Sequence, residues 1–253
     1  MLKCSHQICY LDFRLVYVVE LIDELNQIEL ELKEKDNKPE VAKRFWKVVG
    51  KIKRMNIDEV DDSLIMKAAE IRSKLFKKKV ILSSNKGIAL FSFGFITALL
   101  VFIWFILYFP STSAFIFNFT FFVLELFVLY FTFLVGRIIG GLLSGVKFEG
   151  FYKFSPLEFG MKLDYASYLK STQKNRALFF GFTILWEHII LMFQLVFAWL
   201  FRPEGIWVPL VFLIILLPSQ YVIHRFAKEG ELHRFIRELK ILRETIKIDK
   251  AFK

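Results

Sequence analysis

Four long apolar runs constrain the fold of this 253-residue chain more than any other feature. The first covers 88–109 and contains no charged residue, and the others cover 114–135, 177–201 and 206–223. A helix of about 20 apolar residues crosses the ~30 Å hydrocarbon core of a bilayer. Backbone polar groups in lipid must be bonded internally, which favours helices. The sequence therefore predicts an all-α integral membrane protein with four transmembrane helices.

Lysine and arginine are unevenly distributed around these runs. There are 13 in residues 42–87, seven in 137–176 and nine in 224–253, whereas 110–113 holds none and 202–205 holds one. Cytoplasmic loops beside transmembrane helices carry the excess of these residues. We therefore predict a multi-pass protein of the cell membrane with both termini in the cytoplasm. The two short outer turns would join the spans into two antiparallel hairpins.

Charge and hydrophobicity are segregated along the chain, which is 55% hydrophobic and yet has a formal net charge of +10. We expect residues 1–87 to form a cytosolic domain of amphipathic helices and 224–253 to form a basic amphipathic helix in the cytoplasm. Residues 137–176 would be a polar connection at the cytosolic side. In an alternative, the second span is shorter and 137–146 forms a re-entrant segment.

The first amphipathic helix, expected over 13–36, carries a short heptad seam typical of coiled coils. The seam residues are spaced by three and four: Val18, Leu21, Leu25, Ile28 and Leu32. The remaining faces of this helix are acidic, whereas the 224–253 tail is basic. The sequence therefore predicts that the two helices pair, within one chain or between the copies of a homo-oligomer. Further along, Asp61-Asp62-Ser63 is expected to cap a third helix.

Polar side chains interrupt the second and third apolar runs. Glu125 lies in the second, and Glu187 and His188 lie near the middle of the third. Gln194 follows Glu187 by seven residues and so shares its helix face. A charged side chain at the bilayer centre costs about 2.5–3.5 kcal/mol on insertion scales. These residues indicate either interhelical hydrogen bonds that fix the packing or a pathway for protons or a solute.

A second group of candidate residues lies at the membrane interface. Arg137 ends the second span, and Arg176 lies at the start of the third. Between them, Asp164, Tyr165 and Tyr168 belong to the stretch L-D-Y-A-S-Y-L. Charged and aromatic residues at these places are typical of segments that lie at the level of the headgroups.

The connection also has a distinctive composition. It begins with small residues at Gly136, Gly140 and Gly141, which favour close helix contacts in lipid. Aromatic residues then alternate with charged ones over 147–154, which we interpret as a segment lying at the headgroup level.

Three motifs in this region carry a resemblance: G-V-K-F-E-G-F, P-L-E-F-G and L-D-Y-A-S-Y-L. Together they make residues 130–180 resemble archaeal membrane proteins distantly similar to site-two-protease metallopeptidases. That family binds zinc through H-E-x-x-H, but 130–141 contains no histidine, and Leu191 and Met192 stand where a second histidine would have to follow His188. The resemblance implies a membrane enzyme ancestry without the zinc site, and it transfers no catalytic residue.

Residues 15–90 more faintly resemble part of a PIN-type nuclease domain, through VYVVELIDEL and the stretch that begins IDEVDDSLIMKAAEIRSKL. Nucleases of that family hold divalent metal with several acidic residues. Glu20 matches one, Asp12 lies too close to it, and Asn85 stands where an aspartate is expected. The resemblance therefore implies an inactive relic.

No metal or cofactor is predicted. Cys4, His6 and Cys9 offer three zinc ligands, whereas a closed structural site uses four. Attraction to anionic lipid headgroups accounts for the basic stretches without nucleic acid as a partner.

The function favoured by the sequence is that of a non-enzymatic scaffold or partner-binding protein, because no catalytic constellation is visible. One alternative is an oligomeric transporter or channel-like protein that uses Glu125, Glu187 and His188. Another is a membrane enzyme of degenerate metallopeptidase ancestry.

Overall fold

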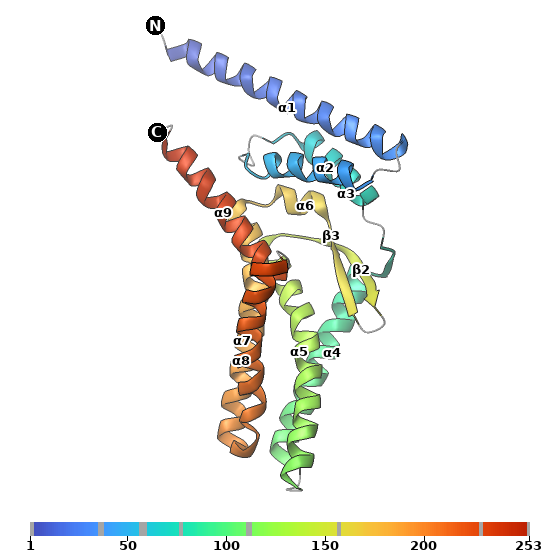
Figure 1. Ribbon diagram of the computed structural model, residues 1–253, viewed down its shortest axis with the longest axis vertical. Coiled ribbons are helices and arrows are strands. Elements are labelled where there is room, and N and C mark those ends of the chain that lie inside the picture. Colours follow the sequence, from blue (N-terminus) through green and yellow to red (C-terminus); the bar gives the residue numbers. More distant parts are fainter. Residues whose placement is uncertain are drawn as a thin grey trace. The chain divides into compact units, whose positions relative to one another are not determined.

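The computed structural model describes residues 3–34, 38–55, 60–75, 78–109, 113–155, 158–227 and 230–251. Side chains are described from residue 16 to residue 247 of these ranges, except at 34, 38, 154, 155, 158 and 217. Helices dominate it, and three short strands complete it (Figure 1). The chain divides into two compact units. The helical unit comprises Met1–Lys78, Asp164–Gln173 and Lys240–Lys253, and the membrane unit comprises Lys79–Leu163 and Lys174–Leu239.

The helical unit is built around three helices from the N-terminal part of the chain and a short one from the connection. They are α1 (Lys3–Glu34), α2 (Lys38–Ile52), α3 (Asp62–Leu75) and α6 (Tyr165–Lys170). Helix α1 packs against α2 and α3, and α3 packs against α6. Leu21, Leu25 and Ile28 of the heptad seam are fully buried. Helices of the same unit thus cover the seam. Helix α1 begins ten residues earlier than the periodicity predicted.

The start of α3 confirms the predicted cap. Asp61 accepts a hydrogen bond from the backbone N–H of Ser63 (3.2 Å) and another from its hydroxyl (2.5 Å). These bonds to the ionised form lower the pKa of the Asp61 carboxyl.

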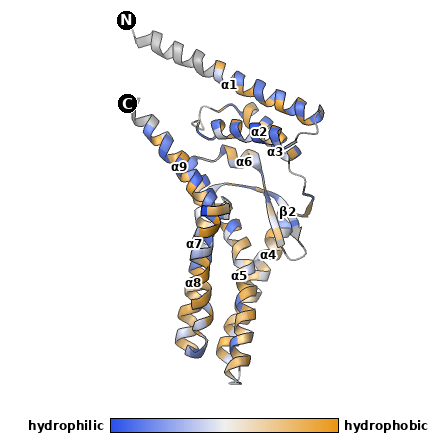
Figure 2. Ribbon diagram, in the orientation of Figure 1, coloured by the Kyte–Doolittle hydropathy of each residue, from blue (hydrophilic) through white to orange (hydrophobic). Residues whose placement is uncertain are grey.

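The membrane unit contains four helices long and apolar enough to cross a bilayer. They are α4 (Ser84–Tyr108), α5 (Ala114–Ser144), α7 (Gln173–Phe201) and the segment Pro203–Ala227, whose main part is α8 (Trp207–Val222). Figure 2 shows the apolar colouring along all four. Each predicted span falls on one of these helices, and only the first extends past its helix, by one residue.

Helix α5 continues well beyond the predicted end of the second span. It ends where Gly145 adopts the left-handed conformation (φ +74°), and the N–H of Val146 bonds to the carbonyl of Gly141 (3.0 Å). Glycine takes this backbone conformation without a Cβ penalty. Residues 137–144 are therefore helical, and the alternative of a re-entrant segment there is wrong.

A three-stranded antiparallel sheet was not predicted. Strands β1 (Val80–Ser83), β2 (Phe148–Ser155) and β3 (Glu158–Leu163) pair in that order. Phe151 and Met161 pack in one buried cluster with Phe91 of α4 and with α5 residues. Gly87 permits this approach, because a Cβ there would lie 2.0 Å from the Phe151 ring. The alternation over 147–154 is thus the period of a strand, and its interpretation as a headgroup-level segment missed the sheet.

The last segments continue from α7. The 3-10 turn η2 (Pro203–Gly205) joins α7 to α8, the π-helical turn η3 (Ile223–Ala227) follows α8, and α9 (Gly230–Ala251) forms the predicted tail helix. The first outer turn, 110–113, lies outside the described residues except for Ser113. Its hydroxyl accepts a bond from the N–H of Ile116 (3.4 Å) and so caps α5.

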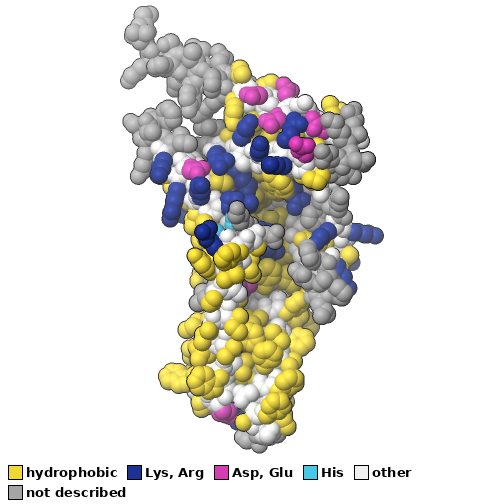
Figure 3. All heavy atoms as spheres, in the orientation of Figure 1, with side chains coloured by type: hydrophobic (Ala, Val, Ile, Leu, Met, Phe, Trp, Pro, Cys, Tyr) yellow, Lys and Arg dark blue, Asp and Glu magenta, His cyan; other side chains and the backbone are white. Residues whose placement is uncertain are grey.

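Large apolar side chains cover the outside of the four long helices. Phe93 is 70% exposed, Phe115 78% and Trp207 66%. Figure 3 shows apolar side chains over the lower part of that view, where these helices lie. Monomeric soluble proteins rarely expose contiguous apolar patches of this kind, whereas hydrocarbon accommodates them.

Candidate interhelical polar sites

The polar residues of α7 form a line along one face of the helix. Arg176, Thr183, Glu187 and Gln194 are spaced by seven, four and seven residues, and Thr183 and Gln194 are fully buried. Such spacing keeps side chains on one face. The Thr183 hydroxyl donates to the carbonyl of Phe179 in its own helix (3.2 Å). Arg176, Glu187 and Gln194 instead bond to residues of other helices.

Glu125 and Gln194 meet between α5 and α7. Both residues have zero exposure, and the amide Nε2 of Gln194 donates to Oε2 of Glu125 at 2.8 Å. Fully buried Phe121 and Val128 flank Glu125 on α5, and fully buried Leu191 and Ala198 flank Gln194 on α7. The two residues thus form a direct interhelical hydrogen bond in apolar surroundings.

Glu187 is bonded to a different helix. Gln220 of α8 donates from Nε2 to Oε2 of Glu187 at 2.9 Å. Glu187 also lies within electrostatic reach of Arg137 and Glu231. His188, its neighbour in the chain, is half-buried, and its Nδ1 lies 2.7 Å from the carbonyl oxygen of Ile184 in the preceding turn. The structure thus does not bring Glu187 and His188 to a common partner.

Helices α5 and α7 approach closely where α5 carries its glycines. A Cβ on Gly140 would lie 2.8 Å from the carbonyl oxygen of Phe179, and one on Gly136 would lie 3.0 Å from the Trp186 ring. The predicted small-residue contact is therefore present, and its partner is α7. Gly141 serves the sheet instead, because a Cβ there would lie 2.6 Å from the ring of Phe148.

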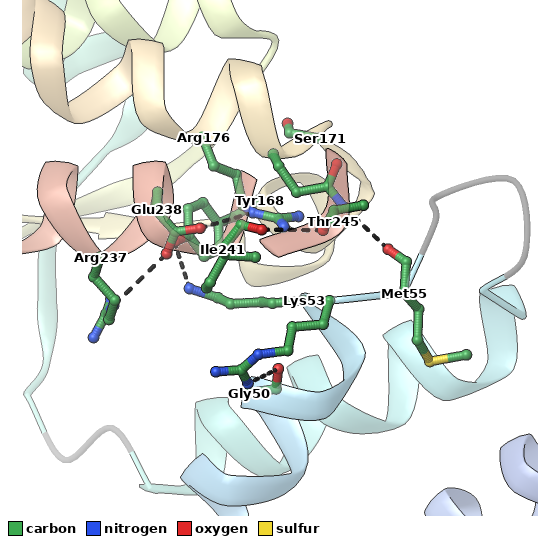
Figure 4. Close-up of polar contacts among 12 residues, drawn as sticks. Gly50, Lys53, Met55, Tyr168, Ser171, Arg176, Arg237, Glu238, Ile241 and Thr245 are labelled. Carbon is green, nitrogen blue, oxygen red and sulfur yellow. Dashed lines mark hydrogen bonds and ion pairs between the residues drawn. The ribbon is translucent and has the colours of Figure 1, made fainter. Parts of the chain in front are cut away.

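Arg137 and Arg176 each pair with a glutamate of α9. Arg137 forms an ion pair with Glu231, which also pairs with Arg234 at 3.4 Å. Arg176 donates from Nε to Oε2 of Glu238 at 3.1 Å, and the two side chains are 2% and 0% exposed (Figure 4). Removing one partner from such a buried pair is costly, because the remaining buried charge loses its nearest counter-charge. Arg137 and Arg176 thus bind the first turns of α9, and these turns are part of the membrane unit.

The other predicted interfacial residues belong to the helical unit. Asp164 caps α6 by accepting from the N–H groups of Ala166 (3.1 Å) and Ser167 (3.4 Å). Tyr165 packs edge-on to the ring of Trp46 with centroids 6.3 Å apart. Tyr168 is buried, and its hydroxyl accepts from Nζ of Lys53 at 2.7 Å. Tyr165 and Tyr168 thus fasten α6 to the N-terminal helices.

Two polar anchors were missed by the sequence analysis. Gln220 lies near the end of the fourth apolar run, two residues after Pro218. A polar amide in such a run is itself an indication of an interhelical hydrogen bond. Arg202 donates to the carbonyls of Ile106 (2.9 Å) and Phe109 (2.6 Å), which ties the end of α7 to the end of α4. Helix C-termini leave such carbonyls without partners, so a lone arginine in a short turn has a structural use.

Charge on α1 is satisfied within the helical unit. Glu29 bonds to Lys67 and Lys74 of α3, and these bonds lower the pKa of its carboxyl to about 2. Glu31 pairs with Arg44 of α2 at 2.7 Å. The acidic face of α1 is thus used at least in part by α2 and α3, and its predicted pairing with the tail stays a prediction.

Among the described residues, no group of three or more His, Cys, Asp or Glu side chains is arranged to hold a metal ion. The side chains of Cys4, His6 and Cys9 lie outside that part of the chain. Comparisons with protein-family models, with curated proteins and with solved structures found no match for this chain.

Proposed function

We propose that this protein is a non-enzymatic membrane scaffold, in which four spans carry a cytosolic helical unit that binds a partner protein. The observation that carries the proposal is the composition of the helical unit, which gathers three stretches separated by the long apolar helices. Stretches that share one compact unit must lie on one side of a bilayer. That condition is met by two antiparallel hairpins with both termini in the cytoplasm, the topology that the distribution of Lys and Arg favours.

The arrangement of polar side chains supports a structural role for the spans. Glu125 is bonded to Gln194 and Glu187 to Gln220, so each acid meets an amide on a neighbouring helix. Polar side chains in lipid stabilise helix association in this way. In a scaffold, these bonds fix the register of the spans and so the places at which the three cytosolic stretches emerge.

The outer face of α2 is suited to recognition. Trp46 is 47% exposed, and Lys43 and Lys47, one turn apart beside it, are exposed and pair with no other described residue. Arg72 lies over the Trp46 ring, 5.7 Å from its centroid. Tryptophan and arginine are enriched where proteins bind one another. The positive charge around this tryptophan favours an acidic partner.

A photocrosslinking amino acid at Lys47 tests this function in intact cells. We expect a discrete protein adduct that disappears when Lys43 and Trp46 are replaced by Glu and Ala. The same crosslinker at Glu70, on the exposed side of α3, serves as the matched control and should not give that adduct. Adducts with lipid alone, or the same adducts from both positions, would contradict the proposal.

Flux measurements separate this function from the transporter alternative, which the line of polar residues on α7 favours. Purified protein in vesicles with an internal pH dye should be no leakier to protons than empty vesicles. Proton flux that depends on Glu125 and Glu187 would contradict the scaffold function and favour the transporter function.

A further inference from the structure

The hydrogen bond between Glu125 and Gln194 leaves two buried oxygen atoms unexplained. Oε1 of Glu125 and Oε1 of Gln194 are both buried, and neither has a hydrogen-bond partner among the residues that the structure describes. Each belongs to a residue with zero exposure, and the two side chains are already joined through their other polar atoms. A buried polar atom without a partner is destabilising because it has lost its hydrogen bonds to water, and here two such atoms belong to the same pair.

The chemistry of the two groups makes the problem specific. An ionised carboxylate can only accept hydrogen bonds, and the oxygen of an amide can also only accept. Turning the Gln194 amide over would put its oxygen beside Oε2 of Glu125 in place of its nitrogen, so the existing bond would be lost and no donor gained. The pair therefore lacks one donor hydrogen, whichever way the amide points.

The neighbouring side chains do not supply that hydrogen. No charged side chain in the described part of the chain acts on Glu125, whereas Arg137 and Glu231 act on Glu187. The flanking residues Phe121, Val128, Leu191 and Ala198 are apolar and have zero exposure. A bridging water would have the two unpartnered oxygens as its partners, the minimum of the two to four that a buried water needs, and it would leave the carboxylate charged in hydrocarbon.

We propose that Glu125 holds a proton on Oε1 and donates it to Oε1 of Gln194, so that α5 and α7 are joined by a two-bond acid–amide pair. One proton satisfies both unpartnered oxygens. It also removes the charge that would make a carboxylate expensive in hydrocarbon. The pair is directional and fits one register of the two helices.

Infrared spectroscopy of the purified full-length protein tests this proposal at neutral pH. A protonated carboxyl group has its own carbonyl stretch, separate from the amide and carboxylate bands. The protein is held in a detergent without ester groups, because esters absorb in the same region. We expect the spectrum of the natural chain minus that of Glu125→Gln to contain the carbonyl band of one protonated carboxyl group. The Glu125→Gln variant keeps size, shape and one bond to Gln194, so it retains the fold.

Two further variants show whether the proton is shared with Gln194. Gln194→Leu removes the acceptor, and the Glu125 band should move to higher wavenumber because its carbonyl has lost a hydrogen bond. Gln220→Leu is the matched control, because it removes the same amide from Glu187 and should leave the Glu125 band in place. A carboxylate band in place of the protonated one, or a band that moves equally in both variants, would overturn the proposal. The partner-binding role of α2 is tested separately and survives that outcome.

Discussion

The helical unit and the membrane unit distribute polar and apolar side chains in opposite ways. In the helical unit, Leu21, Leu25 and Ile28 are fully buried, and the ion pair of Arg54 with Glu244 is exposed. In the membrane unit, Phe93 and Phe115 are mostly exposed, whereas Glu125 and Gln194 have zero exposure. The solvent explains the difference, because water drives apolar side chains together and hydrocarbon does not. Polar contacts therefore add little to the helical unit and determine the packing of the membrane unit.

The largest expected effect contrasts two ion pairs of the same geometry. Arg176 with Glu238 and Arg54 with Glu244 both join Nε to Oε2 at 3.1 Å, but the first pair is 2% and 0% exposed and the second 51% and 37%. Arg176→Ala should lower the free energy of unfolding by about 3 kcal/mol, because the buried Glu238 carboxylate then loses its buried partner and keeps the half-exposed Arg237 at 3.7 Å. Arg54→Ala should cost about 1 kcal/mol or less. Denaturant unfolding in detergent measures both, and equal losses would refute the contrast.

A second comparison uses two helical glycines. In Gly140→Ala the new Cβ meets the Phe179 carbonyl at 2.8 Å, so α5 and α7 must separate, and we expect a loss of about 1–3 kcal/mol. In Gly50→Ala the nearest atom, Nη1 of Arg54, is 3.4 Å away. That variant should be more stable by up to about 1 kcal/mol, because alanine favours the helix. Thermal unfolding of the two variants decides, and a stabilised Gly140→Ala protein would mean that α5 and α7 do not touch there.

The Glu125–Gln194 bond should be revealed by a double-mutant cycle. Gln194→Leu alone is expected to cost about 1 kcal/mol, since it leaves Glu125 without its amide partner. Adding Glu125→Leu should recover most of that loss, because no polar group then remains unpaired. Free energies that simply add across the cycle would show that the two residues do not interact.

The smallest effect is a pH dependence in the helical unit. Lys67 and Lys74 lower the pKa of Glu29 from 4.5 to about 2, so the carboxylate stabilises the fold above pH 4.5. That contribution is lost as the pH falls from there toward 2. Glu29→Gln should flatten the acid side of the stability curve, and added salt should do the same. Glu20→Gln is the control, since Glu20 is exposed and pairs with no other described residue; an equal flattening there would argue against the Glu29 bonds.

Much of the architecture could be predicted from local patterns. The four apolar runs gave the four long helices, and the 3–4 spacing from Val18 to Leu32 gave the buried face of α1. The sheet was missed because its strands are short and lie far apart in the chain, with β1 at 80–83 and β2 at 148–155. Period-two alternation is also compatible with a segment at a membrane surface, so only the pairing distinguishes the two.

The site residues could be selected by type but not paired. A polar side chain in an apolar run is conspicuous, which is why Glu125, Glu187 and Gln194 were found. Their spacing predicted that Glu187 and Gln194 share a helix face, but it did not show that they bond to different helices, α8 and α5. The missing information is the rotation of each helix about its axis, which depends on distant contacts such as those of Gly140 and Arg176.

Accessibility at the middle of α7 tests the central claim, that the polar groups of the spans are packing contacts without access to water. Glu187→Cys and His188→Cys are made separately in a chain whose Cys4 and Cys9 are serine, and a membrane-impermeant thiol reagent is applied from each side. Lys47→Cys on α2 is the positive control. We predict labelling of the control from the cytosolic side and none of either α7 variant. Rapid labelling at Glu187→Cys or His188→Cys, in protein that still inserts and folds, would show a water-filled path and contradict the account.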